Sequence, residues 1–140
     1  MRTLALVMFY GYAAMLVGVG ATGVVTAEWE LRAVFLIPID TYEPMTRATV
    51  LNQYRFLKAV ELSCGVYLFV FRSAIFRDAT HHGLFLLIVF GGVAARGLSF
   101  ALDGRPAWPF FAFTGAELLT GLLVAGYVRY HDLLLMPADE

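Results

Sequence analysis

The chain has one cysteine, few charges and no excess of basic residues. The single cysteine, Cys64, excludes an internal disulfide and any zinc or iron–sulfur site built from cysteines. Ten lysines and arginines stand against eleven acidic residues, which argues against nucleic-acid binding because no positive surplus exists to displace counterions from phosphates. Only 15% of the 140 residues are charged, 60% are hydrophobic, and the mean hydropathy is +0.73. Soluble domains are about 25% charged, so we expect an integral membrane protein.

Four stretches are long and apolar enough to cross a bilayer as helices. They are about residues 4–25, 52–71, 83–102 and 108–128, each close to the roughly 20 residues that a hydrocarbon core of about 30 Å requires. The first stretch is longer than the roughly 7–15 apolar residues of a signal peptide, so we expect it to be retained. The sequence therefore predicts an all-α fold, with residues 1–140 forming one transmembrane four-helix bundle.

The connections between these stretches differ in length. Residues 72–82 and 103–107 form short polar links, so the helices that each link joins are expected to be antiparallel neighbours. The first connection, residues 26–51, is longer and includes an apolar run, 33–37, that Pro38 ends. We expect this run to lie at the membrane interface and to fold over one end of the bundle. The arginines expected on the side of the termini exceed those on the other side by one, which favours two cytoplasmic termini.

Five charged residues fall inside the predicted spans. At a helical rise of about 1.5 Å per residue, Arg55 lies about 4–5 Å deep, Lys58 and Arg96 about 9 Å, and Glu61 and Glu117 about 14 Å. All five therefore lie in the same half of the membrane. An ionised side chain at the centre of a span costs about 2.5–3.5 kcal/mol and needs a partner, so we expect these charges to cluster. Arg96 and Glu117 are the best-supported pair, because a tight turn joins their helices.

Each span also has a stripe of small or polar residues that is expected to face the bundle interior. The stripes are Gly11, Ala14, Gly18 and Thr22 in the first span, Lys58, Glu61 and Gly65 in the second, Gly92, Arg96, Ser99 and Asp103 in the third, and Thr114, Glu117 and Gly121 in the fourth.

The charged cluster has two interpretations. It either fixes which helix faces which, as buried ion pairs often do, or it binds a ligand. With Arg55 included, its net charge is +1, which suits a lipid phosphate, a quinone carbonyl or a small anion; alternatively Glu61 is protonated, since desolvation favours a neutral carboxyl group. We predict no catalytic residue, because no histidine lies within a span to activate a hydroxyl. We also predict no metal site, since His81 and His82 are expected in a solvated turn, and no cofactor other than a bound lipid or quinone.

Three segments resemble a family of small bacterial four-helix membrane proteins that is catalogued as a domain of unknown function. They are residues 52–57, residues 91–98 with the following turn 103–106, and residues 114–119. The family pattern places Arg55, Arg96 and Glu117 at its charged positions, although Ala95 is one residue more than the pattern has before the arginine. The resemblance implies the same bundle and no agreed activity. A broader similarity to DoxX-like membrane proteins is less specific and slightly favours quinone-linked chemistry.

The sequence leads to two functional hypotheses. The first is a non-enzymatic accessory subunit of a larger, bioenergetic membrane complex, because no reactive constellation is visible in the sequence and phenylalanines line the outer faces. The second is a binder, carrier or enzyme for a lipid, quinone or small anion, with Arg55, Lys58, Glu61, Arg96 and Glu117 as its site. Both place the chain in a bacterial inner membrane, in contact with lipid and, under the first, with other membrane subunits.

Overall fold

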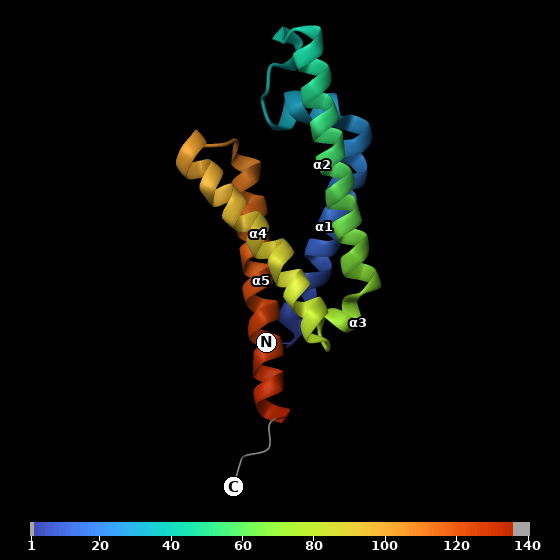
Figure 1. The fold of residues 1–140 in the computed structure, drawn as a ribbon, viewed down its shortest axis with the longest axis vertical. Coiled ribbons are helices and arrows are strands. Elements are labelled where there is room, and N and C mark those ends of the chain that lie inside the picture. Colours follow the sequence, from blue (N-terminus) through green and yellow to red (C-terminus); the bar gives the residue numbers. More distant parts are fainter. Residues whose placement is uncertain (1, 136–140) are drawn as a thin grey trace.

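The computed structural model describes the backbone of residues 2–135 and the side chains of residues 2–129, and within that range it contains helices and no strands. Four long helices, α1 (Arg2–Trp29), α2 (Pro44–Val70), α4 (Ala79–Asp103) and α5 (Trp108–Leu135), correspond to the four predicted stretches (Figure 1). The short helix α3 (Arg72–Ile75) connects α2 to α4. The π-helix η1 (Glu30–Val34) and the 3-10 turn η2 (Ile39–Thr41) connect α1 to α2. The all-α prediction is confirmed.

Local chemistry explains where the helices begin and end. Pro44 opens α2 at a position where its missing N–H leaves no helical bond unmade. The Asp78 carboxylate accepts the backbone N–H of His81 at 2.9 Å and so caps α4. His81 and His82 therefore lie in the first turn of α4 rather than in a loop. At the other end, Gly104 has a φ of 93°, a left-handed conformation that favours glycine and ends α4.

Three segments of the described chain are long and apolar enough to span a membrane. They are Arg2–Val34, Ala79–Asp103 and Trp108–Arg129. The predicted second span differs from them because residues 53–70 of α2 include Arg55, Lys58 and Glu61. Length and composition thus support a membrane protein with three apolar spans, and the part played by α2 depends on where its charged side chains lie.

The helices α1 and α2 are packed so closely that their backbones nearly touch. A Cβ atom added at Gly20 of α1 would lie 2.5 Å from the Leu62 backbone nitrogen, and one added at Gly65 of α2 would lie 2.8 Å from that of Val17. Neither position accepts a side chain without separating the helices. This is the small-residue packing that membrane helices use in place of a hydrophobic driving force.

The second helix pair, α4 and α5, leans away from the first. α5 contacts α1 and α4 contacts α5, as the short turn between α4 and α5 predicts. The expectation that α2 and α4 are close antiparallel neighbours holds only near their junction at α3, because α4 (yellow) then diverges from α2 (green) in Figure 1. The bundle is therefore open at the end where the linker between α1 and α2 lies.

The predicted inward stripe of the first span is wrong. Gly11, Ala14, Gly18 and Thr22 are exposed, whereas the buried face of α1 consists of Ala5, Phe9, Tyr12, Ala13, Leu16, Gly20, Gly23 and Ala27. The large side chains occupy the space between the diverging pairs: the Phe9 ring lies 5.1 Å from that of Phe76 and 5.7 Å from that of Phe85, centroid to centroid. A stripe of small residues alone would leave this space empty.

The first connection is shorter and more helical than predicted, because α1 continues into η1 and α2 begins at Pro44. Its apolar run folds over one end of the helices, as expected. The Phe35 ring lies 4.8 Å from that of Phe110 on α5 and 6.1 Å from that of Tyr54 on α2. The linker therefore ties both helix pairs together at their open end.

Candidate functional site: a charged cavity between the helix pairs

Arg96 and Glu117 form the predicted ion pair between the last two helices. Nε and Nη2 of Arg96 donate to the two carboxylate oxygens of Glu117 at 3.1 and 3.2 Å. The Tyr12 hydroxyl of α1 donates to Glu117 Oε1 at 3.2 Å, so one carboxylate joins three helices. The Glu117 side chain is 7% exposed and that of Arg96 is 29% exposed. The bidentate contact fixes the plane of the guanidinium group and does not use its third nitrogen, Nη1.

Lys58 organises a second group of charges between α1 and α2. Its Nζ donates to Glu61 Oε2 at 2.8 Å and lies 4.0 Å from Glu30 Oε2. The Tyr54 hydroxyl donates to Glu30 at 2.5 Å, and the Thr26 hydroxyl donates to it at 3.0 Å. The Lys58 side chain is only 4% exposed. Each charge in this group thus has an opposite charge or a hydroxyl donor beside it, as an apolar environment requires.

Glu30 is the residue of this group that sequence analysis missed, because it lies beyond the predicted end of the first span. The backbone of Thr26 departs from helical geometry, with φ −97° and ψ 20°, and the chain then winds as the π-helix η1. Such π-helical turns are rare in proteins, and those that do occur are often located at functional sites. The sequence does contain a signal: Gly23, Ala27 and Glu30 follow helical spacing, so extending the first helix from residue 25 to residue 30 places the glutamate on the buried face.

Two glycines make room for the charged side chains. A Cβ atom at Gly23 would lie 2.5 Å from Lys58 Cδ, so the aliphatic stem of the lysine lies directly on the α1 backbone. A Cβ atom at Gly92 would lie 3.4 Å from Glu117 Oε2, at the inner limit of ordinary contact. The glycines therefore set how close the lysine and the carboxylate approach the neighbouring helices.

A cavity of about 330 Å³ lies between the two charged groups. Tyr54, Lys58 and Glu61 of α2 and Arg96 of α4 all line it. The other lining residues are Leu31, Phe35, Ile37, Leu57, Gly92, Ala95, Phe110 and Phe113. Small-molecule sites have volumes from about 300 Å³ upward and apolar walls with a few fixed polar groups. The cavity has both properties.

The cluster that the structure assembles differs in one member from the predicted one. Lys58, Glu61 and Arg96 line the cavity and Glu117 lies directly behind it, whereas Arg55 is exposed and is not among the lining residues. Glu30 takes its place, so three carboxylates now face two cations. The formal charge of the cluster is −1 and not the +1 that the sequence suggested. This reverses the argument for an anionic ligand.

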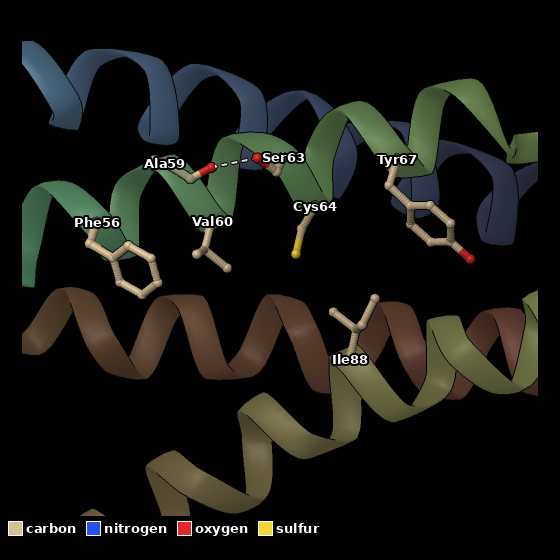
Figure 2. Close-up of a pocket in the computed structure, with 7 residues that line it drawn as sticks. All are labelled: Phe56, Ala59, Val60, Ser63, Cys64, Tyr67 and Ile88. Carbon is tan, nitrogen blue, oxygen red and sulfur yellow. Dashed lines mark hydrogen bonds between the residues drawn. The ribbon is translucent and has the colours of Figure 1, made fainter.

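A second hollow, of about 400 Å³, lies between α2 and α4 and is drawn in Figure 2. Its lining residues are Phe56, Ala59, Val60, Ser63, Cys64, Tyr67 and Ile88. None of them is charged, and the Ser63 hydroxyl donates to the Ala59 carbonyl oxygen at 2.8 Å, within its own helix. The Tyr67 hydroxyl has no hydrogen-bond partner among the described residues, but the hollow has no charged group to orient a ligand, so we assign the site to the charged cavity.

Among the side chains that the structure describes, no three histidine, cysteine, aspartate or glutamate residues lie close enough together to hold a metal ion. At the start of α4, His81 Nδ1 and Asp78 Oδ1 form a pair 2.7 Å apart. In that pair the hydrogen bonds from His81 hold the pKa of Asp78 below its ordinary value. The pair therefore belongs to the helix cap.

Comparison with known proteins gives one match. No curated protein and no solved structure matches the chain. The family model described as "Domain of unknown function (DUF4345)" matches residues 3–127, which include all of α2 and α4, most of α1 and α5, and both charged groups. The chain therefore belongs to the DUF4345 family of unknown function.

Proposed function

We propose that this protein binds a small amphipathic molecule inside the membrane, in the charged cavity. The observation that supports this most strongly is the convergence of Lys58, Glu61 and Arg96, from both helix pairs, on one otherwise apolar space. Charged residues inside a membrane mark functional sites by default, because their insertion is costly. The proposed activity is binding or carriage, because the charged side chains are held in ion pairs with one another.

A purely structural role for the charges does not account for the cavity. The ion pairs are complete without it, because each carboxylate has its own donor. The space of about 330 Å³ is partly open, since Leu57 and Ala95 on its wall are exposed, and it can admit a bound molecule that helix pairing alone does not require.

The proposal includes α2 as a fourth span, with the chain in a bacterial inner membrane and both termini cytoplasmic. The charges of α2 support this, because Lys58 and Glu61 are paired on the inner side of the helix. Arg55 is exposed and lies close to the start of the predicted span 52–71, where a long cationic side chain can extend toward the membrane surface. The orientation is supported by the arginine count of the sequence, with Arg2, Arg72, Arg77 and Arg129 on the side of the termini against Arg32, Arg47 and Arg105 on the other side.

The test is to fill the cavity without touching an ion pair. Ala95 lines the cavity and its neighbour Ala94 does not, although both are exposed, so Ala95→Phe and Ala94→Phe form a matched pair. The wild type and both variants are extracted from their native membrane in a mild detergent, and the small molecules that remain bound are identified by mass spectrometry. We expect one compound to be retained at close to one per chain by the wild type and Ala94→Phe, and lost from Ala95→Phe. Equal retention by all three proteins, or none by any, would refute the proposal.

A second candidate function is that of an accessory subunit in a larger, bioenergetic membrane complex. It is favoured by the exposure of α4, whose main contacts are with α3 and α5. In its most apolar stretch 11% of the residues are buried, compared with 33% in the first span. Its exposed face includes Leu84, Leu87, Ile88, Leu98, Phe100 and Leu102. The same extraction separates the two functions. Stoichiometric partner proteins that are lost on changing this face would make the protein an accessory subunit.

A further inference from the structure

We infer that the head group of the bound molecule is uncharged and is a hydroxyl, held between Glu61 and Arg96, with an apolar tail on the aromatic wall of the cavity. This inference rests on the proposed function and adds the chemical class of the ligand. It follows from which polar atoms the charged groups leave unused and from the charge that the whole cluster has.

The unused polar atoms are one donor and one acceptor. Arg96 gives Nε and Nη2 to Glu117, and no hydrogen bond within residues 2–129 uses its Nη1. Glu61 binds Lys58 through Oε2, and over the same residues its Oε1 makes no hydrogen bond. The Glu61 side chain is 20% exposed, in contrast to the nearly buried lysine. Both residues line the cavity, so a ligand there meets a cationic donor and an anionic acceptor.

Anionic head groups are disfavoured by the charge of the cluster. Three carboxylates against two cations leave a formal charge of −1, and an added anion would raise it to −2 in an apolar environment. Cationic head groups are disfavoured by position. Lys58, Arg96 and Glu61 line the cavity, whereas Glu30 and Glu117 lie behind them, so an ammonium group would meet two cations and only one carboxylate.

A hydroxyl group avoids both penalties and uses both free atoms. It donates one hydrogen bond and accepts others, so it can donate to Glu61 Oε1 while accepting from Arg96 Nη1. Both bonds are charge-assisted, which makes each of them about twice as strong as a bond between neutral groups. The remaining wall, with the rings of Phe35, Phe110 and Phe113, suits an apolar tail.

The first experiment compares four probes that differ only in the head. The protein in phosphatidylcholine nanodiscs is titrated with 1-dodecanol, dodecylamine, dodecyl phosphate and dodecane, and binding to empty nanodiscs is subtracted. Phosphatidylcholine has no hydrogen-bond donor, so it does not imitate the hydroxyl group. We expect 1-dodecanol to bind about tenfold more tightly than each of the other three. If dodecyl phosphate or dodecylamine binds as tightly or more tightly, the inference is wrong while the proposed function stands. If a folded protein binds no probe above the empty nanodiscs, both fail.

The second experiment changes the acceptor. Glu61→Gln keeps the shape of the side chain and removes its charge, and Arg55→Gln is the matched control because Arg55 lies on the same helix outside the cavity. We expect Glu61→Gln to weaken 1-dodecanol binding about tenfold and to leave dodecane unaffected, with Arg55→Gln unchanged for both probes. An unchanged affinity of Glu61→Gln for 1-dodecanol would overturn the inference. The order of the four probes is measured on the wild type, so it decides the question even if Glu61→Gln fails to fold.

Discussion

Replacing Glu117 by glutamine tests how far one shared carboxylate stabilises the helix arrangement. The change keeps the side-chain volume. The amide oxygen of the glutamine can still accept the hydrogen bond that the Tyr12 hydroxyl donates. It removes the negative charge that faces Nε and Nη2 of Arg96, at 3.1 and 3.2 Å. Arg96 then becomes a largely buried cation without its counter-charge.

The expected cost lies between two limits. In a water-soluble core, removing one partner of a buried ion pair costs about 3–5 kcal/mol. Hydrogen bonds between membrane helices average only about 0.6 kcal/mol, because the unfolded helices also find partners in the membrane. Glu117 loses two charge-assisted bonds, and Arg96 is 29% exposed and so recovers part of its solvation. We expect a loss of about 2 kcal/mol, and a coupling of about 1 kcal/mol between Arg96→Gln and Glu117→Gln in a double-mutant cycle.

The assay is reversible unfolding in lipid bicelles, with the free energy of unfolding measured for the wild type, both single variants and the double variant. Glu43→Gln is the control, because Glu43 is exposed and its side chain does not cap the helix that follows it. Its effect is expected to stay within about 0.5 kcal/mol. A Glu117→Gln variant as stable as Glu43→Gln, or a coupling of zero, would refute the reasoning.

Three further predictions follow from the same contacts. Lys58→Met removes the buried cation beside Glu61 and is expected to cost about 2–3 kcal/mol in the bicelle assay, more than Arg55→Met; equal costs would contradict the assignment of Lys58 to the site. Gly20→Val forces α1 and α2 apart and is expected to abolish folding or to cost several kcal/mol, whereas Gly18→Val, on the exposed side of α1, is expected to be tolerated; the reverse order would show that the helix face is misassigned. Hydrogen bonds from His81 hold the pKa of Asp78 below its ordinary 3.8, so the stability that this cap contributes is present above that pH and is lost as the pH falls below it. Asp78→Asn is expected to remove this acid sensitivity, which is measured by unfolding between pH 6 and pH 3.

The parts of the site that the sequence predicts depend on local spacing. Arg96 and Glu117 lie on consecutive helices joined by a tight turn, so depth and connectivity were enough to pair them. Lys58 and Glu61 are three residues apart on one helix, where side chains are neighbours by geometry. The four helical stretches were likewise predicted from a local property, the hydropathy of consecutive residues.

The parts that the sequence did not predict depend on how whole helices are rotated and tilted. The buried face of α1 is set by the contact of Tyr12 with Glu117, which lies 105 residues further along the chain. Glu30 enters the site because α1 continues as a π-helix past its apolar stretch. The divergence of α4 from α2 has no local sequence signal, and the cavity exists only because of it. Arg55, at a suitable depth, is on the wrong face.

The most direct test of the central claim is an experimental structure of the protein purified with its native lipids. The account predicts one elongated, non-protein density in the charged cavity, with its polar end between Glu61 and Arg96 and its length along Phe110 and Phe113. Closure of the space by a shift of α4 onto α2, with Lys58 and Arg96 still paired to their carboxylates and no density between them, would contradict it.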